Sequence, residues 1–442
     1  MKIFLKIIII AGLLYSEPLN AVNTINNDKI NVILIMADDL GYECLGCNGG
    51  LSYNTPNLDE MAAKGMRFEH CYSQPLCTPS RVKLMTGKYN YRNYEGFEYL
   101  NPEEKTFGNI MKKAGYATCI VGKWQLNGIH GYGTELKTWP GSDDKSRPHT
   151  FGFEEYCLWQ LTDRQSRYAN PLIEQNGKTL TGLEDAYGPD VFCDYAIDFI
   201  ERKKDQAFFL YYPLVLPHSP FVPTPDSEEW KFKEKRNVRD ETYFKDMVEY
   251  IDKLVGRIIQ KTEDEGIADH TLILFTGDNG THKSIVSVTR AGSYPGGKGK
   301  MYDAGTHVPL IAYWPGQIKS SSLFEGLIDF SDFMPTFADI AGMKVESDGK
   351  SYYSLLKGES YNEKEIVFVH YDLRLGPGKH DYHDRFARTK EYKLYQDGRF
   401  YHIPTDKWEE NPLPEERRIS WDVLSIRQRL WDVIDSAPEW EK

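Results

Sequence analysis

The chain has no excess of basic residues. Its 442 residues include 53 lysines and arginines against 65 aspartates and glutamates, which gives a formal net charge of −12 at pH 7. This balance argues against nucleic acid as a partner, because binding to a phosphate backbone needs a basic face. It also means that a polyanionic substrate would need a locally basic pocket.

Cysteine is absent after Cys193, and all seven cysteines lie between Cys44 and that residue. An odd number at irregular spacing excludes a disulfide framework. Cys44 and Cys47 have the spacing of a redox motif but lack a thioredoxin-like context. We therefore expect buried or incidental thiols, and one local disulfide is the alternative in an oxidising compartment.

Long apolar runs are missing, apart from one near the start of the sequence. Lys2 and Lys6 flank the run at residues 7–15, which is followed by the ending Leu19-Asn20-Ala21. This is the layout of a secretory signal peptide, and the run is short for a membrane span. We expect residues 1–21 to be a signal peptide, the protein to be secreted or periplasmic, and no stable membrane association. An uncleaved anchor is the alternative.

The sequence contains no internal repeat and no low-complexity tract, but apolar β-branched runs alternate with helix-period segments. This alternation predicts an α/β fold with a large mixed, mostly parallel sheet and helices on both faces. A surface loop is expected at residues 128–148. Strands are expected at residues 31–36, 66–72, 118–121, 208–216 and 271–275. Helices are expected at residues 55–64, 107–114, 190–204 and 240–264.

The pattern changes after about residue 345. Short strands are expected at 367–371, 385–389, 393–396 and 400–403, and Asp397-Gly398 predicts a hairpin turn between the last two. A helix is expected at 421–434. We therefore predict an α/β catalytic domain at residues 22–345 and a C-terminal α+β subdomain at 346–442, a small antiparallel sheet with a helix.

Polar residues follow several of the predicted buried strands. In open α/β sheets, ligands bind outside the carboxyl ends of the strands. A single Asp-Asp pair would be an ordinary polar turn, but here acidic, amide, imidazole and amine groups all recur at such positions. These groups belong to Asp38, Asp39, Lys123, His218, Asp278 and Asn279.

Residues 77–88 have the sequence CTPSRVKLMTGK, in which Cys77, Pro79 and Arg81 follow the pattern C-x-P-x-R. A cysteine at the start of a helix is by itself a candidate thiolate nucleophile. The pattern also resembles the sulfatase signature, the tag for oxidising cysteine to formylglycine. With the Asp-Asp, Gly-Lys-Trp, Pro-His-x-Pro and Gly-Asp-Asn-Gly motifs, residues 31 to about 414 resemble the type I sulfatases of the alkaline phosphatase superfamily.

This resemblance implies a metal site and a modified residue. Oxygen ligands without sulfur suit calcium better than zinc. One calcium ion is expected to be held by Asp38, Asp39, Asp278 and Asn279, with formylglycine made from Cys77 completing the shell. A formylglycine-generating maturation enzyme is the implied partner.

The resemblance also implies roles for the basic residues. Arg81 and Lys123 would hold the hydrated aldehyde, whose oxygen attacks the sulfur of a sulfate ester. His218 and Lys298 would hold the sulfate, and one of them would protonate the leaving alcohol. Lys300, two residues further along, is the alternative to Lys298.

The chain departs from the family pattern at Gln125. Many members have histidine there, which is thought to take the diol proton when sulfate leaves. Glutamine hydrogen-bonds but takes no proton at neutral pH. His130 is near in sequence, and the role has no assigned residue.

The expected function is therefore a sulfatase that acts on a sulfated carbohydrate. The expectation of a carbohydrate substrate rests on the signal peptide, on the 29 tyrosines and on the His, Arg, Asp and Tyr content of residues 370–388. Two alternatives are a phosphonate or phosphodiester hydrolase of the same superfamily and a non-catalytic glycan-binding protein in which Cys77 stays unmodified.

Overall fold

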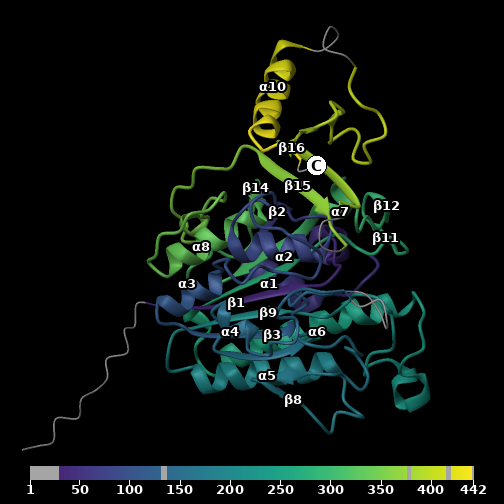
Figure 1. Cartoon of the computed structure of the whole chain (residues 1–442). Coiled ribbons are helices and arrows are strands. Elements are labelled where there is room, and N and C mark those ends of the chain that lie inside the picture. The colour runs from purple at the N-terminus through teal and green to yellow at the C-terminus, as the bar shows by residue number, and fades with distance from the viewer. Residues whose placement is uncertain (1–28, 131–136, 376–379, 415–419, 441–442) are drawn as a thin grey trace, which may run out of the picture.

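The computed structural model describes residues 29–130, 137–375, 380–414 and 420–440 (Figure 1). The predicted signal peptide lies outside the described residues. None of the helices described is long and apolar enough to cross a membrane.

A ten-stranded mixed sheet forms the centre of the protein, in the order β14-β2-β13-β10-β1-β9-β3-β6-β7-β8. The five strands from β10 to β6 run parallel to one another, and β13 is antiparallel to both of its neighbours. This arrangement confirms the predicted sheet. The strands are β1 (Asn31–Ala37), β2 (Met66–Tyr72), β3 (Ala117–Lys123), β6 (Glu155–Trp159), β7 (Glu174–Gln175), β8 (Lys178–Thr179), β9 (Phe208–Pro213), β10 (Thr271–Gly277), β13 (His307–Tyr313) and β14 (Ser322–Asp329).

Helices cover both faces of this sheet (Figure 1). Successive side chains of a strand point to opposite faces. Accordingly, Ile33 and Ile35 of β1 pack in one apolar cluster with α1, α5 and α6, while Val32 and Leu34 pack in another with α2, α3 and α8. The helices are α1 (Pro56–Lys64), α2 (Cys77–Thr86), α3 (Phe107–Lys113), α4 (Arg147–Thr150), α5 (Gly188–Lys203), α6 (Tyr243–Asp264), α7 (Asp303–Thr306), α8 (Phe333–Ile340), α9 (Tyr353–Leu356) and α10 (Trp421–Asp435).

A four-stranded antiparallel sheet follows, as predicted, and α10 packs against it (Figure 1). Gly398 forms the expected turn between its last two strands, with a φ of 91° that favours glycine. The predicted boundary between residues 345 and 346 stays a prediction. The strands are β15 (Val367–Leu373), β16 (Tyr382–Arg388), β17 (Tyr392–Tyr395) and β18 (Phe400–His402).

Two sequence expectations were wrong. The strand predicted at 208–216 ends at Pro213, whose nitrogen has no hydrogen to donate to a ladder. Residues 214–216 are instead a buried segment that leads to His218. The loop predicted at 128–148 contains the paired strands β4 (Ile129–His130) and β5 (Lys137–Thr138) and the start of α4.

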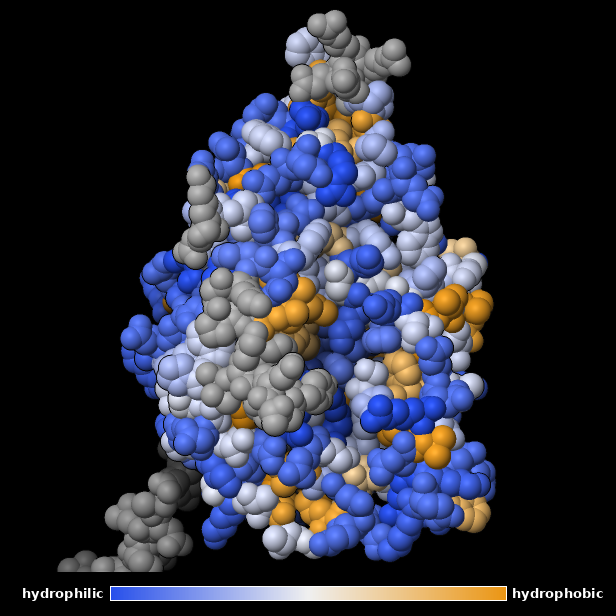
Figure 2. Space-filling view, turned by 45° about the vertical axis from the view of Figure 1, so that its right-hand side comes forward, coloured by the Kyte–Doolittle hydropathy of each residue, from blue (hydrophilic) through white to orange (hydrophobic). Residues whose placement is uncertain are grey.

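The surface is mostly polar. Figure 2 shows hydrophobic residues on this face as small separate groups among hydrophilic ones. The hairpin of β11 (Val286–Thr289) and β12 (Gly292–Pro295) carries two of the exposed apolar side chains, Val286 and Val288. The apolar side chains of the central sheet, in contrast, are almost fully buried, except for Leu323 of β14.

Candidate active site

The loops after β1 and β10 bring four polar side chains together. The two strands pair in parallel with Ala37 opposite Gly277, so that Asp38-Asp39 and Asp278-Asn279 leave the sheet side by side. The backbone N–H of Asp39 donates to Oδ1 of Asp278 at 3.0 Å, and Nδ2 of Asn279 donates to Oδ1 of Asp39 at 2.9 Å. A Cβ on Gly277 would lie 2.1 Å from the carbonyl oxygen of Leu40, so this close approach requires glycine.

Cys77 begins α2 and faces these carboxylates. Its residue is 2% exposed, and Sγ lies within 4.8 Å of carboxylate oxygens of Asp38 and Asp278. Burial raises the pKa of the thiol, against the opposing effect of Lys123. A raised pKa disfavours the thiolate, so it does not support the alternative in which Cys77 acts as a thiolate nucleophile.

Two buried cations are paired with two of the carboxylates. Nζ of Lys123 lies 2.7 Å from Oδ1 of Asp38, and Nη2 of Arg81 lies 2.9 Å from Oδ2 of Asp278. Arg81 also donates from Nη1 to the carbonyl oxygen of Lys123 at 3.4 Å. All four side chains are at most 2% exposed, so these pairs lie in a low-dielectric site where they interact strongly.

A third pair joins the glycine-rich loop at residues 296–300 to the site. Nζ of Lys298 lies 2.6 Å from Oδ2 of Asp39 and 3.1 Å from Nε2 of His218. Nδ1 of His218 lies 2.6 Å from the carbonyl oxygen of Ser219, which leaves Nε2 to accept from Lys298. Burial and then Lys298 lower the pKa of His218 to about 3. Lys300, the alternative to Lys298, is exposed.

The donor set fits a hard divalent cation. Oδ2 of Asp38 and Oδ1 of Asn279 are buried, and neither accepts a hydrogen bond from the residues that the structure describes. Burial, and then the neighbouring Asp38, raise the pKa of Asp278 to about 7. A cation among these oxygens would relieve that repulsion, and oxygen ligands without sulfur suit calcium.

Gln125 lies beside Cys77 in a strained backbone conformation, with φ 51°. Its Oε1 is 3.9 Å from Sγ, and its Nε2 donates to Oε1 of Glu98. Arg164 pairs with the same Glu98 oxygen at 3.2 Å. The sequence analysis missed Glu98, which belongs to no recognisable motif. The side chain of His130 lies outside what the structure describes.

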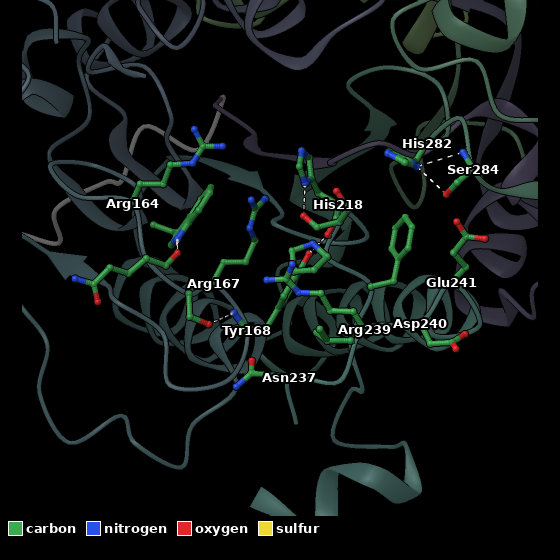
Figure 3. Close-up of a pocket in the computed structure, with 17 residues that line it drawn as sticks. Arg164, Arg167, Tyr168, His218, Asn237, Arg239, Asp240, Glu241, His282 and Ser284 are labelled. Carbon is green, nitrogen blue, oxygen red and sulfur yellow. Dashed lines mark hydrogen bonds between the residues drawn. The ribbon is translucent and has the colours of Figure 1, made fainter. Parts of the chain in front are cut away.

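Arg167 is a second residue that the sequence analysis missed. Its Nη1 lies 3.5 Å from Oδ2 of Asp38, and its guanidinium stacks on Trp159 with 3.9 Å to the ring centre. Arg167 and His218 both line a cleft of about 850 Å³ (Figure 3). No sequence motif marks Arg167, because its place depends on the path of the loop after β6.

Every site residue predicted from the sequence therefore belongs to one connected cluster. Asp38, Asp39, Asp278 and Asn279 surround the space in front of Cys77, and the predicted basic and amide residues border it: Arg81, Lys123, Gln125, His218 and Lys298. The chemical role of each residue stays a prediction.

Family models and sequence relatives both relate the chain to sulfatases. A sulfatase model matches residues 30–343, and a model of the C-terminal part of N-sulphoglucosamine sulphohydrolase matches residues 297–417. A sulfatase of Formosa agariphila is 29% identical, over 100% of this chain and 96% of that protein. The N-acetylgalactosamine-6-sulfatase of Mus musculus is 32% identical, over 72% of this chain and 64% of that protein.

Solved structures share the fold. A structure in complex with its substrate D-glucosamine-2-N,6-O-disulfate has a TM-score of 0.74 and 22% identity, over 94% of this chain and all of that one. The phosphonate monoester hydrolase of Agrobacterium radiobacter has a TM-score of 0.68 and 20% identity, over 92% of this chain and 95% of that one. The family models and the sequence relatives show that the chain belongs to the sulfatase family of the alkaline phosphatase superfamily. The relatives are named as sulfatases, which are sulfuric ester hydrolases.

Proposed function

We propose that the protein is a calcium- and formylglycine-dependent sulfatase that acts on a sulfated carbohydrate outside the cytoplasm. The observation that carries the proposal is the buried oxygen cluster in front of Cys77, with Asp38 and Asn279 each keeping an oxygen that no described residue satisfies. Phosphate or sulfate chemistry at such a centre depends on positioning and charge stabilisation.

The metal and the modified residue would supply the electrophilic and nucleophilic parts of the reaction. Asp38, Asp39, Asp278 and Asn279 would hold calcium, and formylglycine at position 77 would supply, in its hydrated form, the oxygen nucleophile. Arg81 is paired with Oδ2 of Asp278 and Lys123 with Oδ1 of Asp38, so both cations adjoin carboxylates that would hold the metal.

Lys298 and His218 would hold the sulfate that is transferred. They meet at 3.1 Å on the side of Asp39 that opens to the cleft, and their side chains are 16% and 17% exposed. A lysine ammonium neutralises a sulfate monoester, and Nε2 of His218 orients that ammonium by accepting its hydrogen bond. One of the two residues would supply the proton that the leaving alcohol needs.

The carbohydrate part of the proposal has two supports. A relative 32% identical to the chain is named as a sulfatase of N-acetylgalactosamine. The cleft beside His218 has about 850 Å³ and is lined by arginines, polar side chains and the aromatic residues Trp159, Tyr168 and Phe221. Such a lining suits sugar hydroxyls and anionic substituents.

Secretion or transfer to the periplasm, and conversion by a maturation enzyme, complete the proposal. The first rests on the signal-peptide pattern of residues 1–21, the second on Cys77, Pro79 and Arg81. A secreted sulfatase would meet sulfated polysaccharides before they enter the cell.

Peptide mass spectrometry and turnover of a sulfated oligosaccharide test the function together. We expect formylglycine at position 77 in protein made with a maturation enzyme, and loss of turnover in Cys77→Ala. Cys47→Ser is the matched control, because Cys47 is partly exposed and its contacts lie outside the site. Intact thiol at Cys77 in fully active protein would overturn the formylglycine mechanism.

The rival activity is hydrolysis of phosphonates or phosphodiesters. The fold is shared with a phosphonate monoester hydrolase, so the fold does not separate the two. A higher kcat/KM on a phosphodiester than on every sulfate ester tested would favour the rival. Absence of turnover on both classes, with glycan binding retained, would favour the non-catalytic alternative.

A further inference from the structure

The cleft beside His218 is lined by charged residues of both signs. Three arginines line it, Arg164, Arg167 and Arg239, in a protein whose net charge is −12. Arg164 is paired with Glu98. The other two arginines, Arg167 and Arg239, are therefore the ones that could pair with a ligand in the cleft.

Arg167 has an unsatisfied donor in a buried position. The residue is 8% exposed, and among the described residues Nη1 has no hydrogen-bond acceptor, although Oδ2 of Asp38 lies 3.5 Å away. Stacking on Trp159 fixes the plane of the guanidinium. An unfilled hydrogen-bonding position on a buried, oriented arginine at the edge of a cleft points to an oxyanion ligand.

Arg239 lies in the same cleft without a partner of its own. It is exposed, and within the described part of the chain neither a hydrogen bond nor an ion pair involves its side chain. The acidic residues of the lining do not neutralise the arginines. Figure 3 shows Asp240 and Glu241 on the His282 side of the cleft, whereas Arg164 and Arg167 lie on the other side.

We propose that this cleft binds a second anionic group of the substrate, carried on the sugar that holds the scissile sulfate or on its neighbour, and that Arg239 selects for it. The inference rests on the proposed sulfatase function. Lys298 and His218 hold the scissile sulfate, and Arg239, which lines the same cleft as His218, pairs with a sulfate or a uronate carboxylate of the same substrate. Guanidinium suits both anions, because its paired N–H groups match two oxygens.

Two matched pairs of substrates distinguish the sources of the anion. The first pair is a disulfated disaccharide and its monosulfated form, and the second is a monosulfated disaccharide with a uronate or with the corresponding neutral sugar. For each pair the preference is the ratio of kcat/KM values. We expect wild-type protein to prefer the more anionic member of at least one pair, and Arg239→Ala to reduce that preference about tenfold, mainly through KM.

Two further variants separate charge from structure. Arg239→Lys should keep part of the preference because it keeps the charge. Arg290→Ala, which removes an exposed arginine outside the cleft lining, should leave the ratio as in wild type. The proposal is overturned if wild-type protein shows no preference in either pair, or if Arg239→Ala leaves the ratios unchanged.

Binding gives a readout that does not depend on turnover. In a Cys77→Ala background, calorimetry with the disulfated and uronate disaccharides should show weaker binding on adding Arg239→Ala, with a difference that shrinks as salt increases. If the wild-type protein hydrolyses no sulfate ester but this difference persists, the proposed function fails and the anion site stands. If hydrolysis occurs and no binding difference appears, the anion site fails alone.

Discussion

The thiol of Cys77 points at the amide oxygen of Gln125, with 3.9 Å between Sγ and Oε1. A second hydrogen bond fixes the orientation of that amide, because its Nε2 donates to the buried carboxylate of Glu98. Gln125 therefore presents an acceptor, not a donor, to position 77. A hydroxyl at that position would donate to it, but the amide would not remove the proton.

We predict that Gln125→Ala lowers kcat about tenfold, the scale of one hydrogen bond. Gln125→His should be tolerated and should add a titration near neutral pH to the rate profile. Single-turnover kinetics would separate attack from sulfate release. A loss in Gln125→Ala as large as that in Cys77→Ala would contradict a positioning role.

Glu98→Gln should act through the same amide. Its loss in kcat should be absent when Gln125→Ala is already present, because the two residues form one hydrogen-bonded unit. The double-mutant cycle measures this directly. Additive losses would mean that Glu98 acts independently of Gln125.

Lys298 and Lys300 form a matched pair two residues apart. Lys298 contacts Asp39 and His218, whereas Lys300 is exposed. Lys298→Ala should lower kcat/KM on a sulfate ester by at least about 100-fold, since it removes a partly buried charge-assisted contact. Lys300→Ala should change it less than threefold. Equal losses in the two variants would refute the assignment of Lys298.

Removal of the metal should lower activity and thermal stability together. Chelation would leave Asp38, Asp39 and Asp278 crowded without a divalent cation, and added calcium should restore both properties. Elemental analysis should find about one calcium ion per chain. Asp278→Ala should lose the ion, and Asp269→Ala, outside the site, should keep it. Zinc in active protein would refute the calcium assignment.

Lys83 of α2 forms a buried ion pair with the last residue of β14 in the central sheet and a hydrogen bond to β15 of the C-terminal sheet. Nζ of Lys83 lies 2.8 Å from Oδ2 of Asp329 and donates to the carbonyl oxygen of Phe368 at 3.1 Å, with both charged side chains 0% exposed. Lys83→Met should lower the free energy of unfolding by roughly 3–5 kcal/mol, because it leaves a buried carboxylate short of a partner. Lys88→Met removes a partly exposed pair with Glu104 and should cost below about 1 kcal/mol. Denaturant unfolding checks both values, and equal costs would contradict the argument.

Stability should fall as pH drops from about 6.5 to about 4. Burial, then His307 and Arg388, lower the pKa of His70 to about 4. The unfolded chain therefore binds a proton in this window that the folded chain does not, and the folded state loses stability as pH falls. His70→Asn should flatten this part of the pH profile by on the order of 1 kcal/mol, after allowance for partial exposure. His402→Asn is the control, and an unchanged slope in His70→Asn would contradict the assignment.

The sequence predicted the central sheet well because strands buried on both faces carry continuous apolar runs. It predicted the cluster as well, because Asp38, Lys123 and Asp278 each follow such a run directly. It did not identify β6, β13 or β14 as strands. An apolar run also carries no sign of direction, so it could not show that β13 runs against its neighbours. The sequence also did not predict Glu98 and Arg167 as site residues, because they reach the site through loops whose path depends on tertiary packing.

The sheet order has a consequence for the timing of synthesis. Because β1 pairs with β10, the cluster of Asp38 and Asp39 with Asp278 and Asn279 cannot form until the second pair is synthesised, about 240 residues later. Cys77 emerges long before then, and it is 2% exposed once the protein has folded. If a maturation enzyme converts Cys77, as proposed, that enzyme would have to act on the growing or still unfolded chain, and a variant that folds faster would leave it less time to do so.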